Sequence, residues 1–167
     1  MITTAELHRL AGEEGLRFDQ AEKDYVILWI LSGLAHSGVN EQGWVFKGGT
    51  FLRHCYYDGY RFSEDINFSC RPDGGDLEAS LGLLDRVARW VLDESGIRVT
   101  PRDPLKDPGD FQIEIPMEYN RGGARRQGLP QVKVHLTFDE PILDKAQPRR
   151  EAPPRSTVRS GLGDHRR

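Results

Sequence analysis

One stretch of strict alternation constrains the fold of this chain more than any other feature. Apolar side chains recur at every second position in residues 111–119 and again in residues 132–138, with polar residues between them. A period of two is typical of strands with one buried face, and the glycine-containing segment 120–128 joins the two runs. The pattern therefore predicts a long β-hairpin. Both apolar sets reach one face only if odd residues of the first strand pair with even residues of the second.

That register determines what the opposite face of the hairpin carries. Four charged or ionisable side chains meet there: Glu114, Glu118, Lys133 and His135. Pro116 lies on the same polar face. Because proline has no N–H to donate to a neighbouring strand, it predicts an edge position for the first strand of the hairpin.

The rest of the chain alternates between helical and extended patterns. Residues 18–36 are apolar nearly all round, which predicts a buried helix. Residues 76–94 have apolar side chains at intervals of three and four, which predicts an amphipathic helix. Shorter helices are expected at 3–12 and 50–56, and strands at 44–46, 65–68 and 97–99. Together these elements predict an α+β fold: a small mixed β-sheet with helices packed on one face, plus N-terminal helices.

Charge divides the chain into two parts. The net charge of −3 excludes a uniformly basic nucleic-acid binder. Residues 145–167 hold seven basic and two acidic side chains, so residues 1–144 carry a charge of −8. The basic segment also has few apolar residues and no helical or strand period, which predicts disorder. We expect one domain, residues 1–144, followed by a basic, disordered tail, residues 145–167.

Composition also bears on the compartment. The two cysteines, Cys55 and Cys70, are too few for a disulfide scaffold. The chain opens without a charged-then-apolar leader. Its longest apolar run, residues 25–35, is far shorter than the roughly 20 residues of a membrane helix. We therefore expect a soluble, cytoplasmic protein that has no membrane partner.

The residues that carry chemistry lie in two neighbouring segments, 45–52 and 61–68. In the first, a strand ends at Lys47, and Gly48 and Gly49 precede a helix that is expected to begin at Thr50. Glycines let a backbone approach a bulky anion, and the N-terminus of a helix presents free N–H groups. Lys47 adds a positive charge. This segment therefore predicts a triphosphate-binding turn.

The second segment predicts a metal site beside that turn. Its strand places Asp65 and Asn67 two residues apart, and so on the same face. Oxygen ligands of this kind hold Mg²⁺ and leave coordination positions open for substrate phosphates. An anion-binding turn next to a strand with metal ligands is typical of enzymes that catalyse phosphoryl transfer.

With these motifs, the chain resembles the AbiEii/AbiGii toxin family of nucleotidyltransferases, members of the DNA polymerase β-like nucleotidyltransferase superfamily. The matching segments are residues 22–26 (EKDYV), 46–53 (FKGGTFLR) and 60–68 (YRFSEDINF). Residues 132–136 (VKVHL) are similar to the family's following strand. The resemblance covers approximately residues 1–145 and implies a nucleotidyltransferase-like fold.

The resemblance implies an enzyme that transfers a nucleotide from a nucleoside triphosphate to RNA, in some relatives the 3′ end of tRNA, with Mg²⁺ as cofactor. It also implies a bacterial toxin that is paired with an antitoxin and serves in abortive infection or phage defence. Lys47, Gly48 and Gly49 match the family's phosphate-handling segment. Ser63 and Asp65 match its serine and its first metal-binding aspartate.

The chain departs from the family pattern at three places. Asn67 stands where the family usually has an acid, so the site lacks one negative charge. His135 stands near the position of a further acid, and neutral imidazole suits Mg²⁺ poorly. No segment matches the family's helical C-terminal half, and the last 23 residues have two explanations, out-of-frame translation or a true truncation.

These departures leave two hypotheses of function. The first is a nucleotidyltransferase toxin, and the second is a catalytically impaired remnant or a non-catalytic nucleotide-binding module of the same fold. Either Glu114 or Glu118 replaces a missing carboxylate, or both face water. The basic side chains of the hairpin tip and of the tail either contact RNA phosphates or remain solvated; those of the tip are Arg121, Arg125 and Arg126.

Overall fold

The structure, a computed structural model, describes residues 1–57, 60–71, 77–106, 111–122 and 128–142. The predicted tail and two of the three hairpin-tip arginines, Arg125 and Arg126, lie outside these ranges. The elements follow in the order α1 (Thr4–Glu13), α2 (Phe18–His36), the 3₁₀-helix η1 (Val39–Gln42), β1 (Trp44–Lys47), α3 (Gly48–Cys55), β2 (Asp65–Cys70), α4 (Leu77–Ser95), β3 (Arg98–Pro101), β4 (Leu105–Lys106), β5 (Gln112–Asn120) and β6 (Gln131–Thr137).

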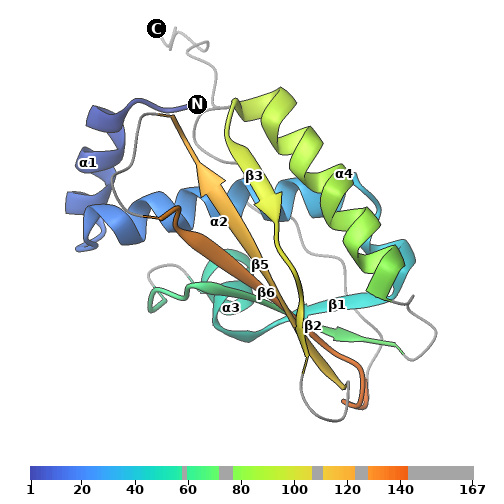
Figure 1. The fold of residues 1–167 in the computed structure, drawn as a ribbon. Coiled ribbons are helices and arrows are strands. Elements are labelled where there is room, and N and C mark those ends of the chain that lie inside the picture. Colours follow the sequence, from blue (N-terminus) through green and yellow to red (C-terminus); the bar gives the residue numbers. More distant parts are fainter. Residues whose placement is uncertain (58–59, 72–76, 107–110, 123–127, 143–167) are drawn as a thin grey trace, which may run out of the picture.

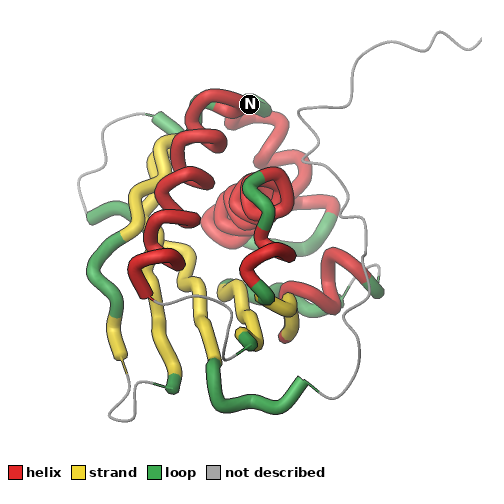
Figure 2. Tube along the Cα trace, turned by 90° about the vertical axis from the view of Figure 1, so that its right-hand side faces the viewer, coloured by secondary structure: helices red, strands yellow, loops and turns green. Residues whose placement is uncertain are grey.

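The six strands form one mixed sheet in the order β1-β2-β6-β5-β3, and the two-residue strand β4 also pairs with β5 (Figure 1). Strands β2 and β6 run parallel, whereas the other neighbours are antiparallel. Figure 2 shows the helices gathered on one side of these strands. The predicted α+β class, with helices packed on one face of a small mixed sheet, is therefore confirmed.

The predicted hairpin is present as β5 and β6, and its register is confirmed. The paired core residues are Ile113 with Leu136, Ile115 with Val134, and Met117 with Val132. The edge position predicted from Pro116 is wrong, because β5 lies between β6 on one side and β3 and β4 on the other. Pro116 is tolerated because it faces the break between β3 and β4, where its carbonyl oxygen accepts a hydrogen bond of 2.8 Å from the N–H of Arg102. Because proline has no N–H, one backbone hydrogen bond from β5 to this neighbouring segment is not formed.

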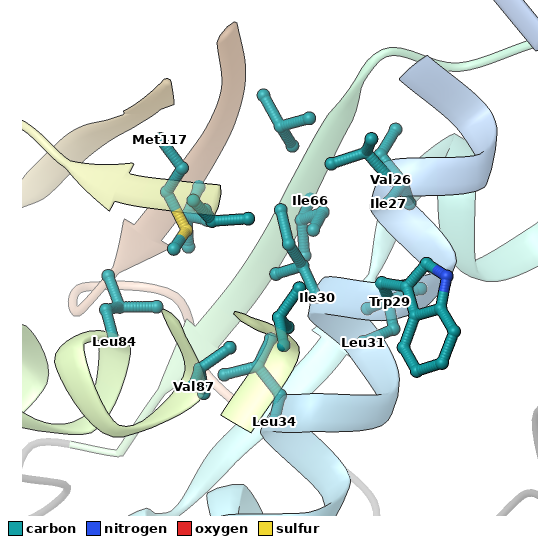
Figure 3. Close-up of a cluster of buried hydrophobic side chains, with 14 of the residues drawn as sticks. Val26, Ile27, Trp29, Ile30, Leu31, Leu34, Ile66, Leu84, Val87 and Met117 are labelled. Atoms are coloured by element: carbon teal, nitrogen blue, oxygen red, sulfur yellow. The ribbon is translucent and has the colours of Figure 1, made fainter. Parts of the chain in front are cut away.

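The core lies between the apolar face of the sheet and the helices α2 and α4. Figure 3 shows side chains of α2, including Ile30, packing among Ile66 of β2, Met117 of β5 and Leu84 of α4. Since α2 is apolar nearly all round, it contacts α1, α4 and the sheet at the same time. The two long helices come close at Gly33, where an added Cβ would lie 2.9 Å from a methyl carbon of Val87.

A buried ion pair joins the hairpin to the N-terminal helices. The Arg121 and Glu22 side chains are each only 8% exposed, with 3.8 Å between Nη1 and Oε1. Arg121 also donates a hydrogen bond of 2.8 Å to the carbonyl oxygen of Ile2, and its guanidinium lies 5.2 Å from the centre of the Tyr25 ring. The prediction that Arg121 is available to bind RNA is therefore wrong, because this side chain is engaged inside the fold.

The long helices are not membrane spans. Within the described ranges, no helix combines the length and the hydropathy that are needed to cross a bilayer.

Candidate functional site

The turn between β1 and α3 lies directly against β2. Helix α3 begins at Gly48, two residues before the expected start at Thr50, so both glycines lie in its first turn. Gly48 has a φ of +82°, in the left-handed region that favours glycine. An added Cβ at Gly48 would lie 3.0 Å from Nδ2 of Asn67, and one at Gly49 would lie 3.0 Å from Oγ of Ser63. The glycines therefore let this backbone touch the side chains that surround it.

The start of α3 presents backbone donors and not a hydroxyl. Lys47 is the N-cap residue, and its side chain makes no capping hydrogen bond. The first N–H groups of the helix therefore receive no acceptor from the cap. Thr50 is fully buried, and its hydroxyl donates to the carbonyl oxygen of Asp65. The predicted role of Thr50 in holding phosphate is thus restricted to its backbone N–H, while its side chain anchors α3 to β2.

Two cationic side chains flank this turn. The Lys47 ammonium pairs with the carboxylate of Glu140, which also accepts a hydrogen bond of 2.7 Å from the hydroxyl of Ser69. These hydrogen bonds, first from Lys47 and then from Ser69, hold the pKa of Glu140 below its ordinary value. The Nη2 atom of Arg61 lies 3.6 Å from the position that a Cβ added to Gly49 would occupy. Arg61 is exposed and forms no ion pair with an acid in the described ranges.

The predicted metal ligands lie on the polar face of β2, beside the turn. Asn67 faces Lys47 across the β1–β2 pair and His135 across the β2–β6 pair. The Nδ2 atom of Asn67 is 3.5 Å from the backbone oxygen of Asp65, which leaves its amide oxygen for a ligand. The Asp65 carboxylate is 44% exposed, and its Oδ2 lies 4.0 Å from Nε2 of His135. The structure thus brings Asp65, Asn67 and His135 onto one face of two adjacent strands.

The two alternative carboxylates differ in position. Glu114 of β5 lies on the same face, 3.7 Å from Nε2 of His135 and 3.1 Å from Nζ of Lys133. His135 therefore separates Glu114 from Asp65. Glu118 lies on this face too, but opposite Gln131, where it pairs with Arg102, and that hydrogen bond lowers its pKa. Glu114 thus shares His135 with Asp65, whereas Glu118 has a different partner.

This set of donors fits a divalent cation only in part. One carboxylate, from Asp65, and one amide oxygen, from Asn67, are chemically suited to Mg²⁺. In the residues that the structure describes, no group of three or more His, Cys, Asp or Glu side chains is arranged to hold a metal ion. A cation here would depend on oxygens of the substrate for most of its ligands.

A buried cluster fixes helix α3 against the N-terminal helices. Arg53 of α3 is 10% exposed and pairs with Asp24 of α2 and with Glu14 at the end of α1. It also donates a hydrogen bond of 2.7 Å to the carbonyl oxygen of Tyr60, in the segment that leads to Ser63. Burial lowers the pKa of Arg53, but Asp24 and Glu14 outweigh this effect and the net shift is upward. Both sides of the glycine turn are therefore attached to the same helical core.

Two residues of the site were not singled out by the motifs. A spacing of two residues separates Arg61 from Ser63, Ser63 from Asp65, and Asp65 from Asn67. This regular spacing is a sequence signal that Arg61 lies beside the turn. Glu140 had none, because it lies three residues beyond β6 and meets Lys47 only through the pairing of distant strands.

The site thus consists of a strand, a two-glycine turn and a helix, set against a strand with an acidic and an amide side chain on its polar face. A sequence profile described as "Nucleotidyl transferase AbiEii toxin, Type IV TA system" matches residues 29–157. The chain belongs to this AbiEii family. No curated protein matches it.

One solved structure shares the fold. JHP933 from Helicobacter pylori is similar, with 23% identity and a TM-score of 0.51. The similarity covers 75% of this chain but 47% of JHP933, so this chain spans about half the length of that protein. A second protein from H. pylori, described as a candidate nucleotidyltransferase, has 21% identity and a TM-score of 0.48, over 77% of this chain and 49% of its own.

Proposed function

We propose that this protein is a nucleotidyltransferase toxin that transfers a nucleotide from a nucleoside triphosphate to RNA, with tRNA as the expected acceptor. The observation that carries the proposal is the convergence of Arg61 and Ser63 on the glycine turn at the start of α3, where Lys47 is the N-cap residue and Thr50 is hydrogen-bonded to Asp65. Backbone donors and cations at a helix N-terminus favour a polyanion. The family match from residue 29 to residue 157 supports the same class of activity.

In the proposed reaction, a hydroxyl oxygen of the acceptor attacks the α-phosphorus of the triphosphate. A new P–O ester bond forms, the bond to the β-phosphate breaks, pyrophosphate leaves with the electron pair, and the acceptor hydroxyl releases its proton to solvent. Lys47 and Arg61 hold the phosphate charges, and Gly48 and Gly49 let the backbone N–H groups approach them. The hydroxyl of Ser63, which faces Gly49, is placed to donate to a phosphate oxygen.

Asp65 and Asn67 are the residues that would hold Mg²⁺. The ion, when bound, would neutralise phosphate charge and orient the triphosphate. Since Asn67 contributes a neutral oxygen, the charge that attracts the cation is one unit smaller than with two aspartates. We expect the cation to bind weakly to the protein alone and more tightly together with the nucleotide.

A second candidate function rests on the same departure. With Asn67 beside it on β2 and His135 opposite on β6, Asp65 is the single carboxylate that strand β2 contributes to the polar face. A fold that keeps the phosphate-binding turn but lacks the metal charge is an impaired remnant or a non-catalytic nucleotide-binding module. The family description names a type IV toxin–antitoxin system, so an antitoxin is the expected protein partner in either case, and a role in phage defence belongs to the proposal as well.

Thermal melts with each of the four nucleoside triphosphates and Mg²⁺ test the binding step. At 100 times the dissociation constant, bound nucleotide should raise the melting temperature by roughly 5–10 °C. Lys47→Ala should reduce that rise, and Lys47→Arg should restore part of it, since the wider guanidinium keeps the charge but not the shape. The matched control is Lys106→Ala, which removes a lysine from β4, on the part of the sheet farthest from β1 and the turn.

Incorporation of labelled nucleotide into total tRNA then separates the two candidates. Incorporation supports the toxin enzyme, whereas a nucleotide-dependent melting shift without incorporation supports the non-catalytic module. If no triphosphate shifts the melting temperature, both candidates are wrong.

A further inference from the structure

A row of aromatic side chains runs from β1 to the surface at the end of α3. Phe46, partly buried against the core, contacts Phe51, with 5.3 Å between ring centres, and Phe51 contacts Tyr56 at 5.0 Å. Tyr56 lies 6.1 Å from Tyr57, and Tyr57 is stacked on Tyr60 at 5.9 Å with 28° between the ring planes. We call the last three residues, Tyr56, Tyr57 and Tyr60, the tyrosine row.

The tyrosine row is unusual in its exposure. Tyr57 is 56% exposed and Tyr56 is 47% exposed. Single exposed apolar side chains are common on protein surfaces and need no explanation. The other large exposed apolar residues in the described ranges are scattered over the chain, at Met1, Leu92, Leu105 and Phe111. Two adjacent exposed rings in contact with a third form an aromatic surface that burial in the core does not account for.

The tyrosine row is connected to the phosphate-binding turn. Helix α3 has eight residues, so its two ends are about 12 Å apart. The turn lies at one end and Tyr56 follows the other. Tyr60 is followed directly by Arg61, whose guanidinium reaches back to Gly49. An exposed cation without an acidic partner in the described ranges therefore lies between the aromatic surface and the turn.

This combination fits one ligand chemistry best. Single-stranded nucleic acids bind where bases stack on aromatic rings and cations neutralise the backbone between them. A duplex hides the faces of its bases, and a protein partner does not require an unpaired cation beside the rings. We infer that the tyrosine row and Arg61 bind an unpaired segment of an RNA acceptor. This inference rests on the proposed function, for which it names the path of the acceptor strand.

Fluorescence anisotropy on the full chain, with a labelled single-stranded RNA of about 12 nucleotides, tests this inference. Tyr57→Ala should weaken RNA binding roughly tenfold, because stacking on one ring contributes at that level. Tyr57→Phe should retain wild-type affinity, since it keeps the ring and loses only the hydroxyl. Leu105→Ala is the matched control and should have no effect. It removes an exposed apolar side chain on β4, near the opposite edge of the sheet from β1.

Two further arms separate stacking from general attraction to phosphate. A duplex of the same length and strand sequence should compete poorly against the single strand. Arg61→Gln should lower the salt dependence of binding by about 0.7 in the slope of log K against log salt, the value for one phosphate on a single strand.

The outcomes distinguish this inference from the proposed function. Wild-type RNA affinity in Tyr57→Ala, or no RNA binding by the wild-type chain, overturns the inference. Equal affinity for single strand and duplex also overturns it. Loss of binding to an antitoxin, with RNA binding unchanged, would assign the tyrosine row to a protein partner instead. The nucleotide-dependent melting shift should be the same in Tyr57→Ala and in the wild type, so its absence in both would contradict only the proposed function.

Discussion

The two faces of the sheet hold their side chains very differently, although they belong to the same strands. On β2, Ile66 and Phe68 point towards the helices and are 0% and 2% exposed. Asp65 and Asn67, each one position away, point to the opposite face and are only partly buried. Because side chains alternate along a strand, the side chains that pack in the core lie on one face and those of the candidate site lie on the other.

This difference shows why the fold and the site can diverge independently. The ion pairs on the polar face, such as Lys133 with Glu114 and Lys47 with Glu140, are partly exposed, and pairs of this kind contribute about 0–1 kcal/mol. We therefore expect substitutions of Asn67 or His135 to leave the fold intact. The helix-covered face has no such freedom, because each side chain there fills space among close-packed neighbours.

The largest expected effect comes from the buried pair of Arg121 and Glu22. Arg121→Ala should lower the free energy of unfolding by about 3–5 kcal/mol, because it removes the cation that faces the buried carboxylate of Glu22. Urea denaturation measures this loss. The double variant Arg121→Met with Glu22→Leu should lose much less, since both charges are replaced by apolar groups. Equal losses in the two variants would show that packing, and not charge, dominates at this place.

The second prediction compares the two faces at adjacent positions of β2. Ile66→Ala should lower the free energy of unfolding by about 2–5 kcal/mol, because it leaves a cavity among fully buried side chains. Asn67→Ala should change it by no more than about 0.5 kcal/mol, as is usual for surface substitutions. Urea denaturation of both variants tests the comparison directly. A large loss in Asn67→Ala would mean that its contact with the glycine turn is structural.

The third prediction concerns the charge at the candidate metal site. Asn67→Asp should tighten binding of a divalent cation roughly tenfold, because it adds a negatively charged ligand beside Asp65. Paramagnetic broadening by Mn²⁺ measures the affinity of both forms. Glu118→Gln, a charge change on the same face but away from Asp65, serves as the control. Equal affinities in Asn67→Asp and wild type would remove residue 67 from the metal site.

The smallest expected effect is at Glu140, whose carboxylate forms an ion pair with the ammonium of Lys47. Glu140→Gln should cost only a few tenths of a kcal/mol in stability, because the pair is partly exposed. It should, however, increase the nucleotide-dependent melting shift, because Lys47 then has no competing anion. An unchanged shift would mean that the ion pair does not limit access to Lys47.

The same pair gives a pH dependence with a definite sign. Lys47 and Ser69 lower the pKa of Glu140 in the folded protein. The stabilisation by Glu140 is therefore present above the pKa of an unfolded glutamate and is lost as the pH falls through the lower folded-state pKa. Acid melts of wild type and Glu140→Gln should converge below that range.

Much of the fold was predictable because its signals are local and periodic. The register of β5 and β6 followed from alternation alone, since a slip by one residue would expose every apolar side chain of the hairpin. The length of α2 followed from its uninterrupted apolar character. The glycine turn and the polar face of β2 were predictable from short motifs of sequence.

What could not be predicted depends on contacts between distant segments. The burial of Arg121 requires α2 and the end of β5 to meet, and nothing near it in the sequence indicates that Glu22 is its partner. The hydroxyl of Thr50 is consumed by the backbone of β2. The interior strand β5 tolerates Pro116 because β3 has ended and β4 has not yet begun at the position opposite it. The assignments of the metal and phosphate ligands, and the division between residues 1–144 and the tail, stay predictions.

The parallel pairing of β2 with β6 has a consequence for synthesis of the chain. Residues 65–69 find their parallel partners at residues 133–137. On the ribosome, β1, α3 and β2 emerge first, and the edge of β2 that faces away from β1 has no strand beside it until β6 has left the exit tunnel. Pairing over such a separation is also slow, because a long loop must close first. The polar face is therefore completed only after β6 has emerged, and a nascent chain without β6 cannot present the assembled site.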